Sequence, residues 1–357
     1  MSEPIRYFVP GPVYVLESTR AAMLGPVVGH RSTEFRTVYA RIAERLKPVF
    51  RTSRDCYLAT SSATMLMEAA LQSFTERSVL HLVNGAFSER WLEIGRSLGR
   101  DSDEISVPWG EIVEPELVRA ALRRKRYEAV TMAHSETSTG VLNPVEAIAD
   151  IVRQESDALV LVDAVSSLAG AKLETDDWGL DFVFAGSQKG LAAPPGLAVC
   201  AYSERSEKRA ESIPHRGYYG DLLRYRDKHR EGGPITTAAV SIAYALDVQL
   251  AKIEREGVEN RWARHLALRE QTTAWAEARS FSWASSEAGR SPTVSCLRPP
   301  AGIVAAELVK AMKRGGYTLG GGYGRFKEST FRVGHMGEVQ ANDLAALFAA
   351  MELEMAS

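Results

Sequence analysis

The chain has 357 residues, of which 45% are hydrophobic and 25% are charged, as in a soluble globular protein with one large and one smaller domain. The 43 Lys and Arg nearly balance the 45 Asp and Glu, and this formal net charge of -2 provides no global field to attract nucleic acid or an anionic membrane. No uncharged apolar run is long enough to span a bilayer, and the N-terminal residues lack the pattern of a targeting signal, so we expect a cytoplasmic protein.

Short apolar runs alternate with helical patterns through the first two thirds of the chain. The apolar runs lack polar alternation and predict strands buried on both faces at 57–60, 79–83, 128–133 and 158–162. The segments between them have helical spacing, at 65–74, 87–98, 115–124 and 144–154. Asn143 is a candidate N-cap for the last of these, before Pro144. This order predicts a doubly wound α/β fold with a mostly parallel sheet.

Two further apolar runs, 181–185 and 197–202, flank a stretch rich in Gly and Pro. The stretch, residues 186–196, is too short for a crossover helix, so we expect the two strands to be antiparallel neighbours and the sheet to be mixed.

The pattern changes near Val240. Long amphipathic helices at 240–256 and 260–279 precede a smaller α+β portion, with strands at 291–298 and 330–333 and helices at 302–313 and 341–354. We therefore predict an N-terminal arm (1–20), a large domain (21–245) and a small C-terminal domain (246–357).

We interpret the cysteines, one basic run and one glycine-rich run as structural features and not as functional sites. Cys56, Cys200 and Cys296 are widely spaced in apolar surroundings, and neither they nor the seven His form a metal-ligand pattern, so we expect no metal. The basic run 123–126 stands at a predicted helix C-terminus, where cations offset the dipole and remain solvated. The glycines of 320–324 do not complete a dinucleotide-binding motif and suggest a flexible loop.

Polar residues follow the predicted strands at the edge where open α/β sheets bind ligands. The Ser-Ser-Ala-Thr run at 61–64 could bind an anion or cap a helix. The ring of Phe87 could stack on a flat ligand or pack in the core. The hydroxyl-rich run 134–140 suits a polar ligand or a turn network. Asp163 is a helix cap or the partner of a cationic ring nitrogen, and Lys189 ends the next strand.

Taken together these groups predict one site for pyridoxal 5'-phosphate. This cofactor has a phosphate, a flat ring, a phenolic oxygen, a ring nitrogen that should be protonated, and an aldehyde that condenses with an amine. Lys189 would then be buried because its amine must be poorly solvated, and hence nucleophilic, at neutral pH.

With these residues, the chain resembles the class V aminotransferases of the fold-type I pyridoxal phosphate superfamily, especially the alanine–glyoxylate/serine–pyruvate aminotransferase group. The resemblance covers nearly the whole chain. It is carried by the segments 10–12, 29–35, 134–144, 162–167, 186–189 and 331–334, and by the spacing from Asp163 to Lys189.

The resemblance implies a role for each matching residue. Lys189 would form the Schiff base and shuttle the proton, and Asp163 would pair with the pyridinium nitrogen. Arg332 would clamp the substrate carboxylate, with Gly11 also at the substrate. The other cofactor contacts would be Phe87 and Val165 on the two ring faces, Ser138 at the phenolic oxygen, and Ser62, Ala63, Thr64, Gln188 and the second subunit's Thr237 at the phosphate.

Three departures from the family pattern affect these assignments. Ala63 stands where relatives often have glycine, which is tolerable if its φ is negative. Phe87 replaces the Trp or Tyr of several relatives. The residues around Thr237 differ from the usual pattern, so Thr236 is an alternative for the inter-subunit phosphate contact.

The activity that the resemblance implies is ping-pong transfer of an amino group from alanine or serine to glyoxylate or pyruvate, in a homodimer with shared sites. The alternative within the same cofactor class is 2-aminoethylphosphonate–pyruvate aminotransferase, for which Arg216 or Arg325 could supply an additional cation. A nicotinamide-dependent dehydrogenase and a P-loop enzyme lack their glycine motifs here. A non-catalytic binding protein would not need Lys189, Asp163 and Arg332 together.

Overall fold

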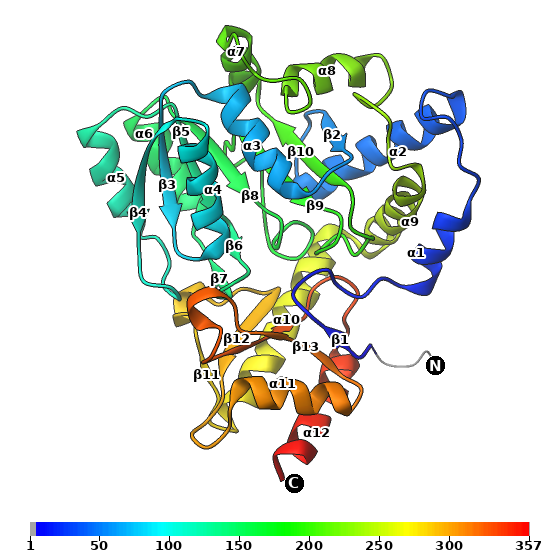
Figure 1. Cartoon of the computed structure of the whole chain (residues 1–357), viewed down its shortest axis with the longest axis vertical. Coiled ribbons are helices and arrows are strands. Elements are labelled where there is room, and N and C mark those ends of the chain that lie inside the picture. The colour runs from blue at the N-terminus through cyan, green and yellow to red at the C-terminus, as the bar shows by residue number, and fades with distance from the viewer. Residues whose placement is uncertain (1–4, 357) are drawn as a thin grey trace.

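The computed structural model describes residues 5–356, so residues 1–4 of the predicted arm and residue 357 lie outside the described part. A seven-stranded sheet and a five-stranded sheet organise the chain, and a short two-stranded ribbon lies beside the larger one (Figure 1). The ribbon consists of β6 (Ser135–Glu136) and β7 (Val141–Leu142). This mixed α/β architecture confirms the predicted fold class.

The larger sheet has the strand order β2-β10-β9-β8-β5-β3-β4. Its strands are β2 (Cys56–Ala59), β3 (Ser78–Val83), β4 (Asp101–Ser106), β5 (Ala129–Ala133), β8 (Leu159–Asp163), β9 (Phe182–Gly186) and β10 (Ala198–Tyr202). Only β10 runs antiparallel to its neighbours, β2 and β9, as the short connection before it predicts.

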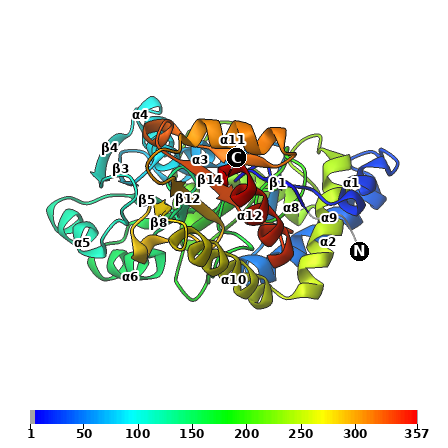
Figure 2. The ribbon, with the colours of Figure 1, turned by 90° about the horizontal axis from the view of Figure 1, so that it is seen from below.

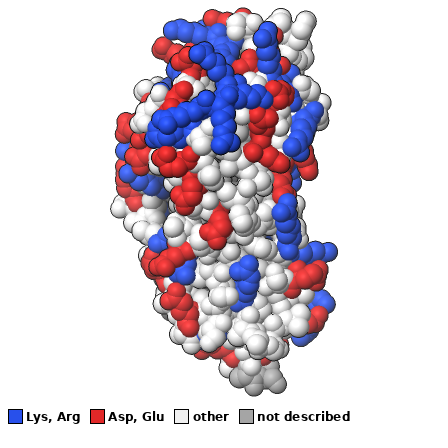
Figure 3. Space-filling model, turned by 90° about the vertical axis from the view of Figure 1, so that its left-hand side faces the viewer, with Lys and Arg blue, Asp and Glu red and all other residues white. Residues whose placement is uncertain are grey.

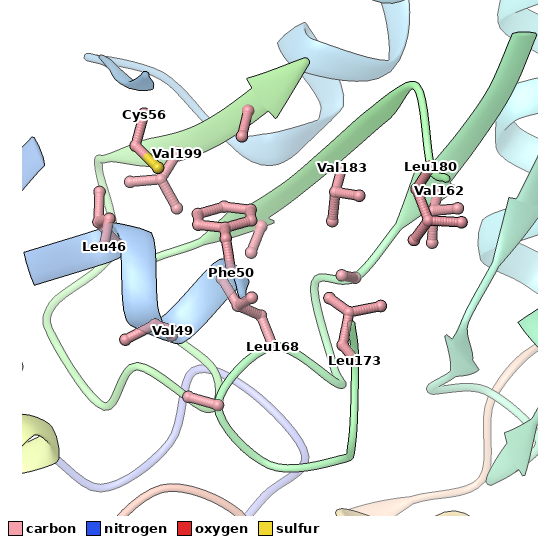
Figure 4. Close-up of a cluster of buried hydrophobic side chains, with 14 of the residues drawn as sticks. Leu46, Val49, Phe50, Cys56, Val162, Leu168, Leu173, Leu180, Val183 and Val199 are labelled. Atoms are coloured by element: carbon pink, nitrogen blue, oxygen red, sulfur yellow. The ribbon is translucent and has the colours of Figure 1, made fainter. Parts of the chain in front are cut away.

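Helices cover both faces of the larger sheet because alternate strand side chains are apolar on both sides. Val183 and Ala185 share a core with helices α2, α5, α6 and α9, whereas Phe182 and Phe184 share another with α3, α4, α7 and α8. Figure 4 shows part of the first core, where Phe50 lies among side chains of the sheet and of the segment after β8. The helices are α2 (Thr33–Phe50), α3 (Ala63–Phe74), α4 (Ala86–Ser97), α5 (Pro115–Arg124), α6 (Val145–Glu155), α7 (Glu204–Ser212), α8 (Leu222–Arg230) and α9 (Val240–Glu256).

The smaller sheet has the order β1-β13-β14-β12-β11 and packs against three helices, which Figure 2 shows from below. Its strands are β1 (Tyr7–Phe8), β11 (Ser282–Trp283), β12 (Val294–Arg298), β13 (Thr318–Gly321) and β14 (Phe331–Gly334). The helices are α10 (Val258–Glu277), α11 (Ala305–Arg314) and α12 (Ala341–Ala356). The remaining short elements are α1 (Glu17–Ala21), η1 (Ala22–Leu24), η2 (Glu287–Gly289) and η3 (Gly324–Phe326).

One strand was not predicted, and two local expectations were wrong. Strand β4 was not predicted, because its charged sequence is typical of an edge strand and it pairs only with β3. Gly320 and Gly321 belong to β13 rather than to a flexible loop, since β14 pairs with them. Asn143 is not the N-cap of α6: Pro144 is, and the Asn143 amide instead donates to the carbonyl of Ala133 at 2.8 Å.

The basic run at the end of α5 behaves as expected of a solvated helix C-terminus. Figure 3 shows Lys and Arg gathered on the upper part of this face, with Asp and Glu interspersed. Arg123 pairs with Glu155 at 2.9 Å, and Lys125 pairs with Asp101 at 2.7 Å and Asp103 at 2.9 Å.

Candidate functional site

Lys189 stands in the turn between β9 and β10, where three strand ends converge. Its Nζ donates hydrogen bonds to the Thr137 hydroxyl at 3.2 Å and to the Ser166 hydroxyl at 3.1 Å. Thr137 follows β5 and Ser166 follows β8, and these two hydroxyls also bond to each other. The parallel register of β5, β8 and β9 therefore brings this cluster together at the carboxyl edge of the sheet.

The Lys189 ammonium is poorly stabilised in this position. Its side chain is buried, and burial together with the nearby positive charge of Arg332 lowers its pKa from 10.5 to about 7. A neutral, nucleophilic amine is consequently well populated at neutral pH.

Asp163 is the last residue of β8 and is buried. Its Oδ1 accepts a hydrogen bond from the backbone N–H of Val165 at 2.8 Å, and no described residue forms an ion pair with it. Burial, with a smaller contribution from Glu136, raises the pKa of Asp163 to about 7. A cationic group beside this carboxylate would offset its desolvation.

Gly11 packs directly against the lysine. A Cβ at this position would lie 2.4 Å from Cε of Lys189, and the φ of +131° is also unfavourable for other residues. Glycine is therefore required by both contact and backbone conformation.

Arg332 extends from β14 of the smaller sheet to the same cluster. Its Nη1 donates to the carbonyl of Thr137 at 3.1 Å, and its Nε donates to the carbonyl of Gly321 at 2.9 Å. Burial lowers the pKa of this guanidinium below its ordinary value. The two bonds fix the plane of the group, as bidentate recognition of a carboxylate requires.

Phe87 lies at the start of α4 with three groups near its ring. Lys189 Nζ is 5.6 Å from the ring centroid and the Arg90 guanidinium carbon is 4.9 Å from it. The ring of Tyr323 is stacked on it at 5.8 Å with an interplanar angle of 18°. The structure therefore places an aromatic face beside the lysine, as the sequence predicts.

Ser138 is held by the buried Glu136. Its hydroxyl donates to Glu136 Oε1 at 2.6 Å and accepts from the backbone N–H of Ala86 at 3.0 Å. The same carboxylate accepts from the N–H groups of Phe87 and Ser88, so it caps α4 and ties this helix to the 134–140 segment.

The Ser-Ser-Ala-Thr run forms the N-terminus of α3. Ser62 is the N-cap residue but makes no side-chain capping bond, and Ser61 Oγ is buried without a hydrogen-bond partner among the described residues. Ala63 is helical, so its φ is compatible with alanine. Unfilled donors at a helix N-terminus provide a cradle that fits a phosphate. Gln188 folds back over Gly186, next to Lys189.

The two candidate threonines for the inter-subunit contact and the two candidate arginines for a phosphonate are not part of the cluster around Lys189. Thr236 lines a narrow space with Thr60 of its own chain, whereas Thr237 is exposed. Arg216 is bound by Asp221 at 2.9 Å, and Arg325 is paired with Glu89 at 2.7 Å. Neither arginine is a free cation for a phosphonate within this chain.

Four residues of the site, Thr137, Ser166, Glu136 and Tyr323, had no individual role predicted from the sequence. Thr137 and Ser166 lie in the polar segments that follow β5 and β8, so their position after a strand was the available signal. The stacking of Tyr323 on Phe87 depends on contact between distant segments and has no local pattern.

Comparison with known proteins identifies the family. The model of the class V aminotransferase family matches residues 17–310. The chain belongs to the class V aminotransferases. This membership makes it an enzyme and implies pyridoxal phosphate as the cofactor.

Individual relatives of this aminotransferase carry different names. The chain is 33% identical to serine–glyoxylate aminotransferase of Methylorubrum extorquens, over 98% of this chain and 90% of the relative. It is 34% identical to the soluble hydrogenase small subunit of a Synechococcus species, over 100% and 94%. The structure of alanine–glyoxylate aminotransferase from Nostoc has a TM-score of 0.93 at 29% identity, over 99% and 96%. The similarities to the two glyoxylate aminotransferases place this aminotransferase in the alanine/serine–glyoxylate group.

The described residues contain neither a membrane-spanning helix nor a metal-binding cluster. No helix within residues 5–356 is long and apolar enough to cross a membrane. Over the same residues, no group of three or more His, Cys, Asp or Glu side chains is arranged to hold a metal ion.

Proposed function

We propose that this aminotransferase moves the amino group of alanine or serine to glyoxylate or pyruvate in a ping-pong cycle with pyridoxal phosphate. The observation that carries the proposal is that Lys189 and Arg332 both bond to Thr137, one at its hydroxyl and the other at its carbonyl. An amine and a carboxylate-binding group are thus held a short distance apart, as an α-amino acid requires.

The residues fit the cofactor chemically. Bound pyridoxal phosphate supplies an aldehyde that accepts the amino group and a protonated ring that withdraws electrons. Asp163, buried without an ionic partner among the described residues, would hold the ring nitrogen, and Ser62, Ala63, Thr64 and Gln188 would hold the phosphate at the α3 N-terminus. Phe87 and Val165 would contact the ring faces, and Ser138 the phenolic oxygen.

Lys189 would then act as the base that moves the proton from Cα of the amino acid. Its depressed pKa leaves the amine free to accept a proton near pH 7, and the hydroxyls of Thr137 and Ser166 orient Nζ. Gly11 keeps the space beside the lysine open for this side chain.

A substrate with one carboxylate and a small side chain suits the charges of the site. Arg332 is fixed by two carbonyls and is a matched partner for a carboxylate. The alternative substrate, 2-aminoethylphosphonate, has less support because Asp221 and Glu89 already pair with Arg216 and Arg325.

We also propose that the protein is a cytoplasmic homodimer with shared active sites. We propose that the chain is divided into an N-terminal arm (1–20), a large domain (21–245) and a small C-terminal domain (246–357). Thr237 is favoured over Thr236 for contact with the second subunit's phosphate, because its side chain is exposed whereas Thr236 packs against its own chain.

Half-reactions test the substrate proposal. The holoenzyme is mixed with alanine, serine or 2-aminoethylphosphonate, and the cofactor absorbance is followed by stopped flow. We expect rapid conversion with alanine or serine and recovery on adding glyoxylate or pyruvate. An unchanged spectrum with both amino acids, or conversion with the phosphonate alone, would overturn the assignment.

A further inference from the structure

The turn that carries Lys189 is held by an arginine from outside the site. Arg261 lies in the first turn of α10 and is completely buried. Its Nη2 donates a hydrogen bond to the carbonyl of Gly190, the residue directly after Lys189, at 2.9 Å. Arg261 thus reaches the main chain beside the reacting amine from a helix that supplies no residue to the proposed site.

The same nitrogen connects this turn to the segment that follows β14. Nη2 of Arg261 also donates to Oε1 of Glu338 at 3.0 Å. Glu338 comes four residues after the end of β14, the strand that carries Arg332. One nitrogen therefore bonds both to the chain beside the reacting amine and to the chain that continues from the carboxylate-binding arginine.

The two segments also pack directly against each other. Met336 shares a small buried cluster with Ala192 of the Lys189 turn. Gly337 has a φ of +78°, and a Cβ there would lie 3.1 Å from Cβ of Ala192 and 3.7 Å from the carbonyl oxygen of Lys189. Because packing this close transmits displacements, a shift of either segment would move the other.

Two carboxylates balance the charge of Arg261. Besides Glu338, Glu256 accepts a hydrogen bond from Nη1 at 2.6 Å. The side chains of Glu256 and Glu338 are 26% and 14% exposed, whereas that of Arg261 is 0% exposed. A buried guanidinium is costly without such partners, so the two ion pairs fix its orientation.

Helix α10 is anchored in both cores and runs from the larger sheet to the smaller one (Figure 1). Val258 at its start belongs to the core of the larger sheet, and Leu268 and Trp275 belong to the core of the smaller sheet. His265 adds a further bond, since its Nε2 accepts from the N–H of Gly337 at 3.1 Å. The helix is therefore a firm base for a link between the two sheets.

Arg264 provides a matched reference for Arg261. It also pairs with Glu256, at 2.7 Å, and it donates to the carbonyls of Gly337 at 3.0 Å and Val339 at 2.6 Å. Within residues 5–356 its guanidinium forms no hydrogen bond to the Lys189 turn. Contact with the Gly190 carbonyl therefore distinguishes Arg261 from its neighbour.

We propose that Arg261 is a positioning residue that sets the distance between the Lys189 amine and the Arg332 guanidinium. It acts through the main chain and not through contact with the substrate. The inference rests on the proposed function, in which these two groups bind the amine and the carboxylate of one α-amino acid. Its consequence is selection for an amino group and a carboxylate on the same carbon atom.

Alanine and β-alanine test this selection, because β-alanine has one more carbon between the amine and the carboxylate. The holoenzyme's kcat/KM is measured for both acids and for ethylamine, which has no carboxylate. In Arg261→Gln we expect kcat/KM for alanine to fall roughly 10- to 100-fold and its ratio to that for β-alanine to fall roughly tenfold. The value for ethylamine should change little, whereas a merely structural role would lower all three alike.

A second measurement does not depend on activity. Hydrogen exchange of the peptide 187–196 in the holoenzyme, measured by mass spectrometry, reports on the turn, in which the N–H of Ala192 bonds to the carbonyl of Lys189 at 2.8 Å. We expect roughly tenfold faster exchange in Arg261→Gln. Arg264→Gln should change neither this exchange nor the substrate ratio by more than about twofold.

Arg261→Lys is the variant to use if circular dichroism shows that Arg261→Gln does not fold. It keeps a charge for the two carboxylates but lacks the planar fork, so the same changes are expected at a smaller size. An unchanged ratio and exchange in a folded Arg261 variant, equal losses with all three amines, or the same changes in Arg264→Gln would overturn the inference. If the wild-type enzyme converts neither alanine nor serine while the exchange changes as expected, the proposed function fails instead.

Discussion

At the scale of single residues, the proposed chemistry depends on the lowered pKa of the Lys189 amine. Burial is the largest cause of its depressed pKa and the nearby Arg332 is the second, while Asp163 acts in the opposite direction. A lysine in water would be almost wholly protonated at pH 7 and unable to attack a carbonyl. The fold therefore activates this amine by removing water and adding a neighbouring cation.

The depressed pKa gives a pH dependence with a definite sign. Below about pH 7 the amine is protonated and unreactive, and above it the amine is neutral, so the rate at which the apoenzyme takes up pyridoxal phosphate should rise through about pH 7 and then level off. Stopped-flow absorbance measures this rate. Arg332→Leu should move the midpoint to higher pH, whereas Arg325→Leu should not. A rate that still rises near the ordinary lysine pKa of 10.5 would contradict the account.

Gly11 offers a steric test at the same scale. Gly11→Ala would place a Cβ 2.4 Å from Cε of Lys189 at a φ of +131°, so the lysine must move. We expect kcat/KM to fall roughly 100-fold, as misplacement of a reacting group by about 1 Å does. Gly29→Ala is the control, because a Cβ there meets nothing within 4 Å. Equal activity of the two variants would remove the proposed role of Gly11.

At the scale of elements, Glu136 connects α4 to the segment that follows β5. Its carboxylate accepts from the N–H groups of Phe87 and Ser88 and from the hydroxyl of Ser138. The position of the Phe87 ring therefore depends on a residue that touches neither the lysine nor the arginine by hydrogen bonding.

Glu136→Ala tests this connection. The variant leaves buried donors of α4 unpaired, so we expect the free energy of unfolding to fall by about 3 kcal/mol. Urea denaturation measures the change. Glu93→Ala, on the exposed side of the same helix, should alter stability by less than about 0.5 kcal/mol. Similar values for both variants would show that Glu136 does not cap the helix.

Some strands of the large sheet could be predicted from the sequence, whereas one strand and the contacts between strand ends could not. The buried runs of β5, β8 and β9 were predictable because they are mainly apolar and lack polar alternation, and they place Asp163 and Lys189 at one edge. Strand β4 was missed because its sequence is charged and none of its residues is buried, so only its pairing with β3 makes it a strand. The partners of Lys189, Thr137 and Ser166, belong to two other strand ends, so their contact follows only from the register of the sheet.

At the scale of the whole molecule, the site joins the two sheets. Arg332 belongs to β14 of the smaller sheet, yet its Nη1 donates to the carbonyl of Thr137 beside Lys189. Substrate binding and the reacting amine thus depend on how the two sheets meet.

Arg332→Lys tests this arrangement while retaining the charge. Lysine cannot reproduce the two fixed bonds and bidentate contact with a carboxylate, so we expect kcat/KM for alanine to fall roughly 100-fold. The half-reaction with ethylamine, which has no carboxylate, should change little. A similar loss with both amines would show that Arg332 acts on the lysine and not on the carboxylate.

The most direct test of the account is to reduce the holoenzyme with borohydride and map the modified peptide by mass spectrometry. We predict a pyridoxyl group on Lys189 alone, and no incorporation into that peptide in Lys189→Ala. A modification on another lysine, or full turnover by Lys189→Ala, would contradict the central claim that this buried amine carries the cofactor.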